Sequence, residues 1–173
     1  GSRAKFGVLR VNRDIFQDST VGVLLTDREF KGSHNRVGSV DTHLRLNSNT
    51  NLNMQAVTTR TQQQDGTTEN GPAYYLELER TGRQFTYGFE YKDIGSGFNS
   101  TPGFVRRRDI RGVENRIGYR FRPEGKYLIS WGPYIYTEKL WDQVGTRLDW
   151  RVRPSLSFEF VRNTSLGFWM DTG

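Results

Sequence analysis

Apolar and polar residues alternate one by one along most of this chain. In the segment 83–93, the odd-numbered positions from Phe85 to Tyr91 are all aromatic, whereas the positions between them are small, polar or charged. A period of two is typical of a β-strand with one apolar and one polar face. The run 72–80 alternates in the same way, and Thr81-Gly82 between the two runs is a tight-turn signal. This part of the chain is therefore predicted to be a β-hairpin.

The same alternation predicts about ten strands, and no segment keeps a helical period. The expected strands are residues 4–12, 19–28, 36–46, 50–61, 72–80, 83–93, 108–122, 126–138, 144–153 and 155–163. The fold class is therefore all-β, an antiparallel up-and-down meander. Pro133, in the run 131–133, has no N–H to donate to a ladder, so a bulge or strand bend is expected there.

The predicted connections are of two kinds that alternate along the chain, with the turn at 13–18 intermediate. The short ones are 47–49, 81–82, 123–125 and 153–154, and the long ones are 29–35, 62–72, 94–107 and 139–143. Short turns at one end and long loops at the other are typical of bacterial outer-membrane barrels. We therefore predict a transmembrane β-barrel, or a segment of one, in the bacterial outer membrane.

Alternation alone does not say which face of each strand is inside. In a lipocalin-like barrel or a sandwich the apolar face points inward, with the same period of two. Two hypotheses follow. The first is an outer-membrane channel or scaffold, porin-like, through which oligosaccharides or other small polar solutes pass. The alternative is a soluble β-barrel or sandwich that binds a sugar or an apolar ligand through its aromatic residues.

Under the membrane hypothesis, the two faces of the strands define two sets of residues. The charged residues predicted to face the lumen are Arg45, Glu77, Glu79, Glu90, Lys92, Glu114, Arg116, Arg120, Arg122, Arg147, Asp149, Arg151 and Glu159. The aromatic residues predicted to face lipid are Tyr74, Phe85, Tyr87, Phe89, Tyr91, Tyr119, Phe121, Trp131, Trp150, Phe158 and Phe160. The charges either select a solute or form a ladder of ion pairs that fills a narrow barrel.

Composition limits the remaining possibilities. The chain has 173 residues and no cysteine, which excludes disulfides and thiolate chemistry. Its mean hydropathy of -0.72 excludes a helical membrane protein but is compatible with a barrel, in which only every second residue is apolar. The net charge is +6, but the basic residues are scattered, so no nucleic-acid partner is predicted. Residues 1–2 look like a cloning remnant, and 3–173 a single β-barrel domain, a fragment of a larger barrel.

Catalytic chemistry has little support in the sequence. The two histidines, His34 and His43, lack metal-ligand spacing to any cluster, and no cofactor is predicted. Asp41 and His43 share a strand face, which is compatible with an acid–base pair in an outer-membrane hydrolase. A structural hydrogen bond or a lumen charge is the simpler interpretation, so no enzymatic activity is predicted.

The segment 95–109 stands apart from the other connections. It combines glycine and serine with aromatic residues and a basic cluster at 106–108. We expect it either to fold into the lumen or to cap the barrel.

Three segments resemble DUF5916, a bacterial family of unknown function in which a carbohydrate-binding-like module precedes a large outer-membrane barrel. The segments are Ser19–Gly22 with Thr26–Arg28, Asn35–Gly38 leading to Asp41, and Pro102–Asp109. The resemblance implies an envelope protein of a Gram-negative bacterium that handles oligosaccharides and has the lipid bilayer as its partner. It supplies no catalytic residues, and a fragment of such a barrel could also associate with a second copy.

Overall fold

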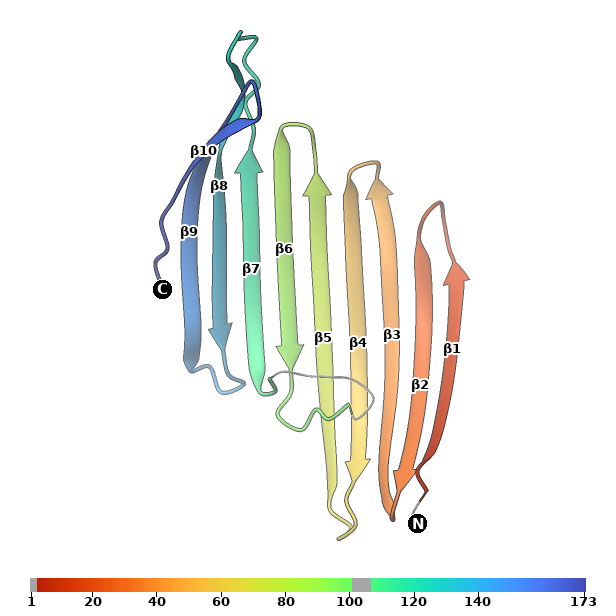
Figure 1. Cartoon of the computed structure of the whole chain (residues 1–173). Coiled ribbons are helices and arrows are strands. Elements are labelled where there is room, and N and C mark those ends of the chain that lie inside the picture. Colours follow the sequence, from red (N-terminus) through yellow and green to blue (C-terminus); the bar gives the residue numbers. More distant parts are fainter. Residues whose placement is uncertain (1–2, 101–106) are drawn as a thin grey trace.

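The computed structural model describes residues 3–100 and 107–173, which form a single antiparallel sheet (Figure 1). Its ten strands are β1 (Lys5–Asp14), β2 (Thr20–Phe30), β3 (Ser33–Asn47), β4 (Thr50–Gln62), β5 (Thr68–Thr81), β6 (Phe85–Ile94), β7 (Ile110–Tyr119), β8 (Leu128–Trp141), β9 (Arg147–Phe160) and β10 (Thr164–Trp169). Each strand pairs with the next along the chain, so the predicted up-and-down meander is confirmed. The sheet is open, with β1 and β10 at its edges, and closure into a barrel stays a prediction.

The largest difference from the predicted strands concerns Pro154. The strands expected at 144–153 and 155–163 are one strand, β9, and β10 lies beyond the last strand predicted. The carbonyl oxygen of Pro154 accepts a hydrogen bond from the N–H of Met170 (3.1 Å), on the side of β10. In an antiparallel ladder the N and O of one residue point to the same neighbour, so the missing N–H faces the end of β10 and no bond to β8 is lost.

The irregularity expected around Pro133 is confirmed. The ladder between β7 and β8 breaks opposite Pro133 and resumes only as an isolated bridge between Phe121 and Trp131. On the other side of β8, the register with β9 shifts between Leu128 and Ser130. The residue without an N–H therefore lies where pairing with one neighbour is interrupted.

Connections of different lengths are not sorted to opposite ends of the sheet. The bottom end in Figure 1 has connections 31–32, 63–67, 95–109 and 142–146, and the top end has 15–19, 48–49, 82–84, 120–127 and 161–163. The long loop expected at 29–35 is a two-residue turn in which Lys31 and Gly32 both have positive φ, 49° and 77°. This is the geometry of a tight hairpin turn, so most of the polar run belongs to the strands. The predicted segregation of short turns from long loops is wrong.

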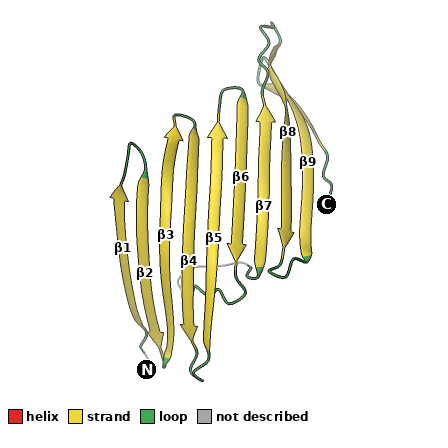
Figure 2. Cartoon of the chain, turned by 180° about the vertical axis from the view of Figure 1, so that it is seen from behind, coloured by secondary structure: helices red, strands yellow, loops and turns green. Residues whose placement is uncertain are grey.

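The two faces of the sheet differ in how tightly their side chains pack. The pairing registers put Val37, Ser39 and Thr59, all buried, on one face, which we call the polar face. Leu9 is 57% exposed and Tyr74 is 50% exposed on the opposite, apolar face. Figure 2 shows a single layer of strands with no helix on either side among the described residues. The apolar face is therefore open to its surroundings.

Candidate functional site

The middle of the apolar face carries no charged side chain among the described residues. This apolar band consists of Leu9, Val11, Val21, Val23, Leu25, Val40, Thr42, Leu44, Leu52, Met54, Ala56, Tyr74, Leu76, Leu78, Phe85, Tyr87, Phe89, Tyr91, Val113, Asn115, Ile117, Tyr119, Pro133, Ile135, Thr137, Val152, Pro154, Leu156, Phe158, Leu166 and Phe168. Charged residues of the same face occur only towards the strand ends, at Lys5, Arg13, Asp27, Glu29, Arg36, Arg60, Arg80, Asp93, Arg111 and Lys139. The aromatic residues predicted to meet lipid all share this face, while their contact with lipid stays a prediction.

The apolar band runs obliquely across the strands. One row of directly paired residues, which we call the reference row, crosses the sheet through Arg13, Val21, Thr42, Met54, Leu76, Tyr91, Val113, Lys139 and Trp150. The reference row contains two charged residues. Arg13 on β1 lies at the top border of the band, whereas Lys139 on β8 lies at its bottom border. The band therefore climbs relative to the row from β1 to β8, as the staggered strand ends in Figure 1 also do.

The slope of the band is close to one residue per strand. At the bottom border, Asp27 on β2 is six residues below the reference row, and Lys139, six strands further on, lies on the row. At the top border, Arg13 on β1 lies on the row, and Arg80, four strands further on, is four residues above it. One residue of about 3.4 Å per strand spacing of about 4.8 Å corresponds to strands tilted by about 35° from the normal of the band.

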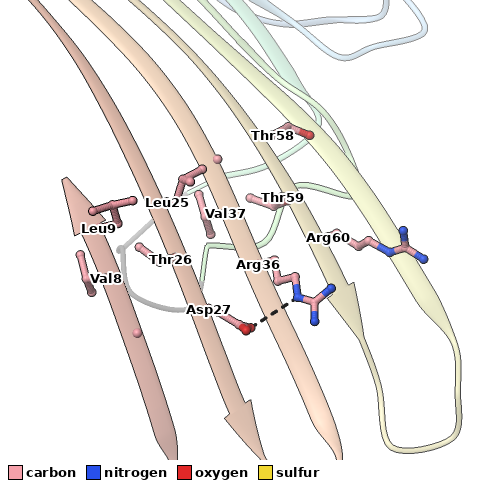
Figure 3. Close-up of a pocket in the computed structure, with 12 residues that line it drawn as sticks. Val8, Leu9, Leu25, Thr26, Asp27, Arg36, Val37, Thr58, Thr59 and Arg60 are labelled. Atoms are coloured by element: carbon pink, nitrogen blue, oxygen red, sulfur yellow. Dashed lines mark ion pairs between the residues drawn. The ribbon is translucent and has the colours of Figure 1, made fainter. Parts of the chain in front are cut away.

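Figure 3 shows the bottom border of the band over β1 to β4. Leu9 and Leu25 lie above, and an ion pair joins Arg36 Nε to Asp27 Oδ1 at 3.5 Å below them. A depression of about 580 Å³ opens here, where Gly7 and Gly38 contribute no side chain. On β2, Leu25 of the band and Asp27 of the ion pair are only two residues apart, so the border is sharp.

Aromatic rings form a row across the top border, from the connection just after β7 to β8 and β9. Phe121 stacks on Trp131 with centroids 4.4 Å apart and planes 18° apart, and Trp131 is followed by Phe158 at 6.2 Å and 13°. The row continues to Phe160, whose ring lies 6.5 Å from that of Phe158 with the planes 16° apart.

On the polar face, four carboxylates lie directly opposite one another on adjacent strands. Glu77, Glu90, Glu114 and Glu138, which we call the glutamate row, come from β5, β6, β7 and β8. Like charges directly opposite each other on a sheet destabilise it. The row therefore depends on cations placed beside it.

Three basic residues supply that charge. Lys92 Nζ lies 3.3 Å from Glu114 Oε1 and 3.7 Å from Glu90 Oε1, between the two carboxylates. Arg116 Nη2 lies 3.5 Å from Glu77 Oε1. Arg151 Nη1, on β9, lies 3.9 Å from Glu138 Oε2. Six of the predicted lumen charges, together with Glu138, thus share the polar face and form three groups of ion pairs across β5 to β9.

Glycines allow two arginines to cross a whole strand. A Cβ added at Gly88 of β6 would lie 2.8 Å from Arg116 Nε, because that side chain passes over β6 on its way to β5. A Cβ added at Gly22 of β2 would lie 2.4 Å from Arg10 Nη2, because Arg10 of β1 passes over it to reach Asp41 of β3.

The structure gives Asp41 and His43 different partners. Asp41 accepts two hydrogen bonds from Arg10, and one of them measures 2.8 Å from Nη2 to Oδ2. His43 Nδ1 lies 2.6 Å from Asn53 Oδ1, and Asn53 Nδ2 in turn donates to Glu77 (3.0 Å). The two side chains share the polar face as predicted, but no hydrogen bond joins them in the described part of the chain, so the acid–base pair is not formed.

Other predicted lumen residues lie outside the glutamate row. Arg45 pairs with Asp18, Glu159 accepts a hydrogen bond from Ser130, and Asp149 accepts one from the N–H of Trp150. Glu79 also lies on the polar face. Arg120 and Arg122 follow the end of β7, in the connection to β8, so the strand predicted at 108–122 is too long at its C-terminal end. Arg122 lines a pocket with Phe85 and Tyr119 of the apolar face, and Arg147 lies opposite Trp141 beyond a register shift, so the structure does not place these two predicted lumen residues on the polar face.

Two polar-face residues that bind charged side chains were not among the predicted lumen residues. Tyr75 on β5 donates from its hydroxyl to Glu90 (3.4 Å), and Asp171 binds Arg153 Nη2 at 2.6 Å. The alternation alone places Tyr75 on this face, because Tyr75, Glu77 and Glu79 follow one another at intervals of two residues on β5. Asp171 could not be predicted, because it lies beyond the end of β10 and is held beside β9 by an isolated bridge between Val152 and Thr172.

The described part of the connection after β6 folds onto the polar face. The N–H of Asn99 donates to Thr59 Oγ1 (3.1 Å), and Asn35 Nδ2 donates to the carbonyl oxygen of Asn99 (2.8 Å). Phe98 is 5% exposed, and Gly71 below it leaves no room for a Cβ, which would meet the backbone N of Phe98 at 2.0 Å. Residues 95–100 therefore lie against the polar face, whereas the choice between folding into a lumen and capping a barrel stays a prediction, and 101–106 lie outside the described residues.

Comparisons with family models, curated proteins and solved structures find no match. The resemblance to DUF5916 therefore stays a prediction, and residues 102–106 of its third segment, like the cloning remnant at 1–2, lie outside the described residues. Within the described chain, no helix is long and apolar enough to cross a bilayer. The same residues contain no cluster of His, Asp and Glu that could hold a metal ion.

Proposed function

We propose that this sheet is part of the wall of an outer-membrane β-barrel that acts as a channel or scaffold for small polar solutes. In this proposal the apolar band faces lipid and the polar face lines the lumen. The observation that carries the proposal is the uncharged apolar band with its slope of one residue per strand.

The slope has a direct physical meaning in a membrane. Strands of transmembrane barrels tilt by about 35–45° from the bilayer normal, and the outward apolar zone is about 25 Å tall. A band parallel to the membrane plane must therefore cut obliquely across the paired rows, at about the angle observed here. On β1 the charges Lys5 and Arg13 are eight residues apart, which is about 27 Å along the strand and about 22 Å along a normal tilted by 35°.

The alternative, a soluble barrel or sandwich, requires the apolar face to be covered by protein. A core between two sheets follows their facing side chains and has no need for a charge border that climbs steadily from strand to strand. No layer in the described chain covers the band. Folding as a monodisperse monomer without detergent would favour this alternative.

The lumen side of the proposed wall carries charge and a docked segment. The glutamate row and its cations form a charged strip across β5 to β9, and residues 95–100 cover part of β3 to β5 near the bottom end. Such features select solutes by charge and size. In hydrocarbon the free edges of β1 and β10 need hydrogen-bonding partners, so the proposal requires these edges to pair with each other or with further strands.

Single-cysteine labelling tests the orientation, because the chain has no cysteine of its own. Met54 and Gln55 are neighbours on β4 that point to the apolar and the polar face. A nitroxide at Met54→Cys should collide mainly with oxygen in vesicles, and one at Gln55→Cys mainly with a water-soluble nickel chelate. The proposal fails if both labels are equally accessible to nickel. The channel part is tested separately, because it requires conductance in a planar bilayer.

A further inference from the structure

Three arginines converge on one pocket at the top border of the apolar band. Arg80 comes from the end of β5, Arg83 from the turn 82–84, and Arg122 from the segment after β7. The pocket has a volume of about 410 Å³ and also exposes Phe85 and Tyr119. We call it the arginine pocket.

Backbone hydrogen bonds hold the three sources together. The N–H of Gly82 donates to the carbonyl oxygen of Phe85 (3.0 Å), which tightens the turn that carries Arg83. The N–H of Arg120 donates to the carbonyl oxygen of Gln84 (2.7 Å), which ties the segment of Arg122 to the same turn. The pocket is thus part of the sheet border and does not depend on a free loop.

The charge of this pocket is not balanced by protein. No carboxylate lines it, and none of its arginines forms an ion pair with a described acidic residue. On the polar face, by contrast, Lys92, Arg116 and Arg151 each have a carboxylate partner. Like charges held together favour a bound anion, and guanidinium groups match the geometry of phosphate.

The apolar side of the pocket indicates what kind of anion fits. Phe85 and Tyr119 lie directly opposite each other on β6 and β7 and belong to the apolar band. A ligand in the arginine pocket therefore meets three cations at one end and aromatic rings at the other. We propose that the arginine pocket binds the phosphate of an anionic phospholipid, with an acyl chain along Phe85 and Tyr119. The lipid source rests on the proposed function, in which this border lies at headgroup level.

Titration of the detergent-solubilised full chain tests this proposal with three probes. These are dihexanoylphosphatidylglycerol, dihexanoylphosphatidylcholine with the same chains but no net charge, and inorganic phosphate. We expect phosphatidylglycerol to bind more tightly than the other two. Replacing Arg80, Arg83 and Arg122 with glutamine should abolish the preference. Each replacement should lower the affinity for phosphatidylglycerol roughly fivefold. A matched variant, with Arg13, Arg60 and Arg147 replaced by glutamine, keeps the same net charge change and should retain the preference.

Two results would overturn the proposal. Equal loss of preference in the matched variant would show a general charge effect, and inorganic phosphate binding as tightly as phosphatidylglycerol would show a free-anion site. The label at Met54→Cys separates these failures from a failure of the membrane orientation. If that label lies in lipid while the chain with its own three arginines shows no preference for phosphatidylglycerol, only the arginine pocket is wrong.

Discussion

Arg116 on β7 reaches Glu77 on β5 by passing over Gly88 of the strand between them. The ion pair spans 3.5 Å from Nη2 to Oε1, and the glycine provides the passage. The pairing of Arg10 with Asp41 over Gly22 repeats the arrangement at the other side of the sheet. Both pairs link strands that share no ladder, so they tie the polar face together across its rows.

Gly88→Ala is expected to destabilise the sheet by about 1–3 kcal/mol, because the added methyl group would overlap the Arg116 side chain. Unfolding in urea and detergent measures this. Gly167→Ala is the control, since a Cβ there meets nothing within 4 Å on the same face. Gly88→Ala should destabilise the sheet less when Arg116 is replaced with methionine. Equal destabilisation by Gly88→Ala and Gly167→Ala would contradict the passage of Arg116 over Gly88.

In vesicles, Leu76→Arg should lower the free energy of unfolding much more than Val21→Arg, although both residues lie on the reference row. In the oblique band Leu76 lies near the middle, whereas Val21 lies near the top border beside Arg13. Arginine on the lipid face costs about 2–4 kcal/mol at the midplane and about 0–1 near the interface. Folding titrations from urea give both values. Similar costs for the two variants would rule out the oblique membrane border.

Thr59→Val should loosen the segment 95–100. Thr59 is 1% exposed and accepts the N–H of Asn99, and valine leaves that donor unpaired. An unsatisfied buried donor costs about 1–3 kcal/mol, which raises the open population roughly 5- to 150-fold. Trypsin cleavage at Arg107 or Arg108 reports this opening. Thr58→Val, on the opposite face of β4, should leave the cleavage rate unchanged, and a rate unaffected by Thr59→Val would contradict the anchor.

The turn 63–67 should weaken in acid. The N–H of Thr67 donates to Asp65 Oδ1 (2.9 Å), and this bond holds the pKa of the Asp65 carboxyl below its usual range. Because the pKa is depressed in the fold, the contribution is present at neutral pH and is lost as pH falls through the lowered value. The amide proton shift of Thr67 should therefore titrate below the usual aspartate range. It should stop titrating in Asp65→Asn, and a midpoint in the usual range would refute the bond.

The oblique border, the arginine pocket and the docked segment could not be predicted from the sequence. Whether Arg13 and Lys139 lie on one row depends on every register between β1 and β8, which no local pattern specifies. The convergence of Arg80, Arg83 and Arg122 depends on a hydrogen bond between two distant segments. The polar run 29–35 was predicted to be a loop, although most of it belongs to β2 and β3. Polarity alone does not distinguish a loop from the polar end of a strand.

Alternation by itself determined the meander and the membership of each face. Phe85, Tyr87, Phe89 and Tyr91 share one face, and Glu77, Glu90 and Glu114 share the other. Side chains along a strand point alternately to either side, whatever strands lie beside it. Only the tertiary structure decided which charges meet and how the apolar band runs. Those features arise between strands, where pairing registers set the stagger and a missing Cβ at Gly88 or Gly22 opens the path for an arginine.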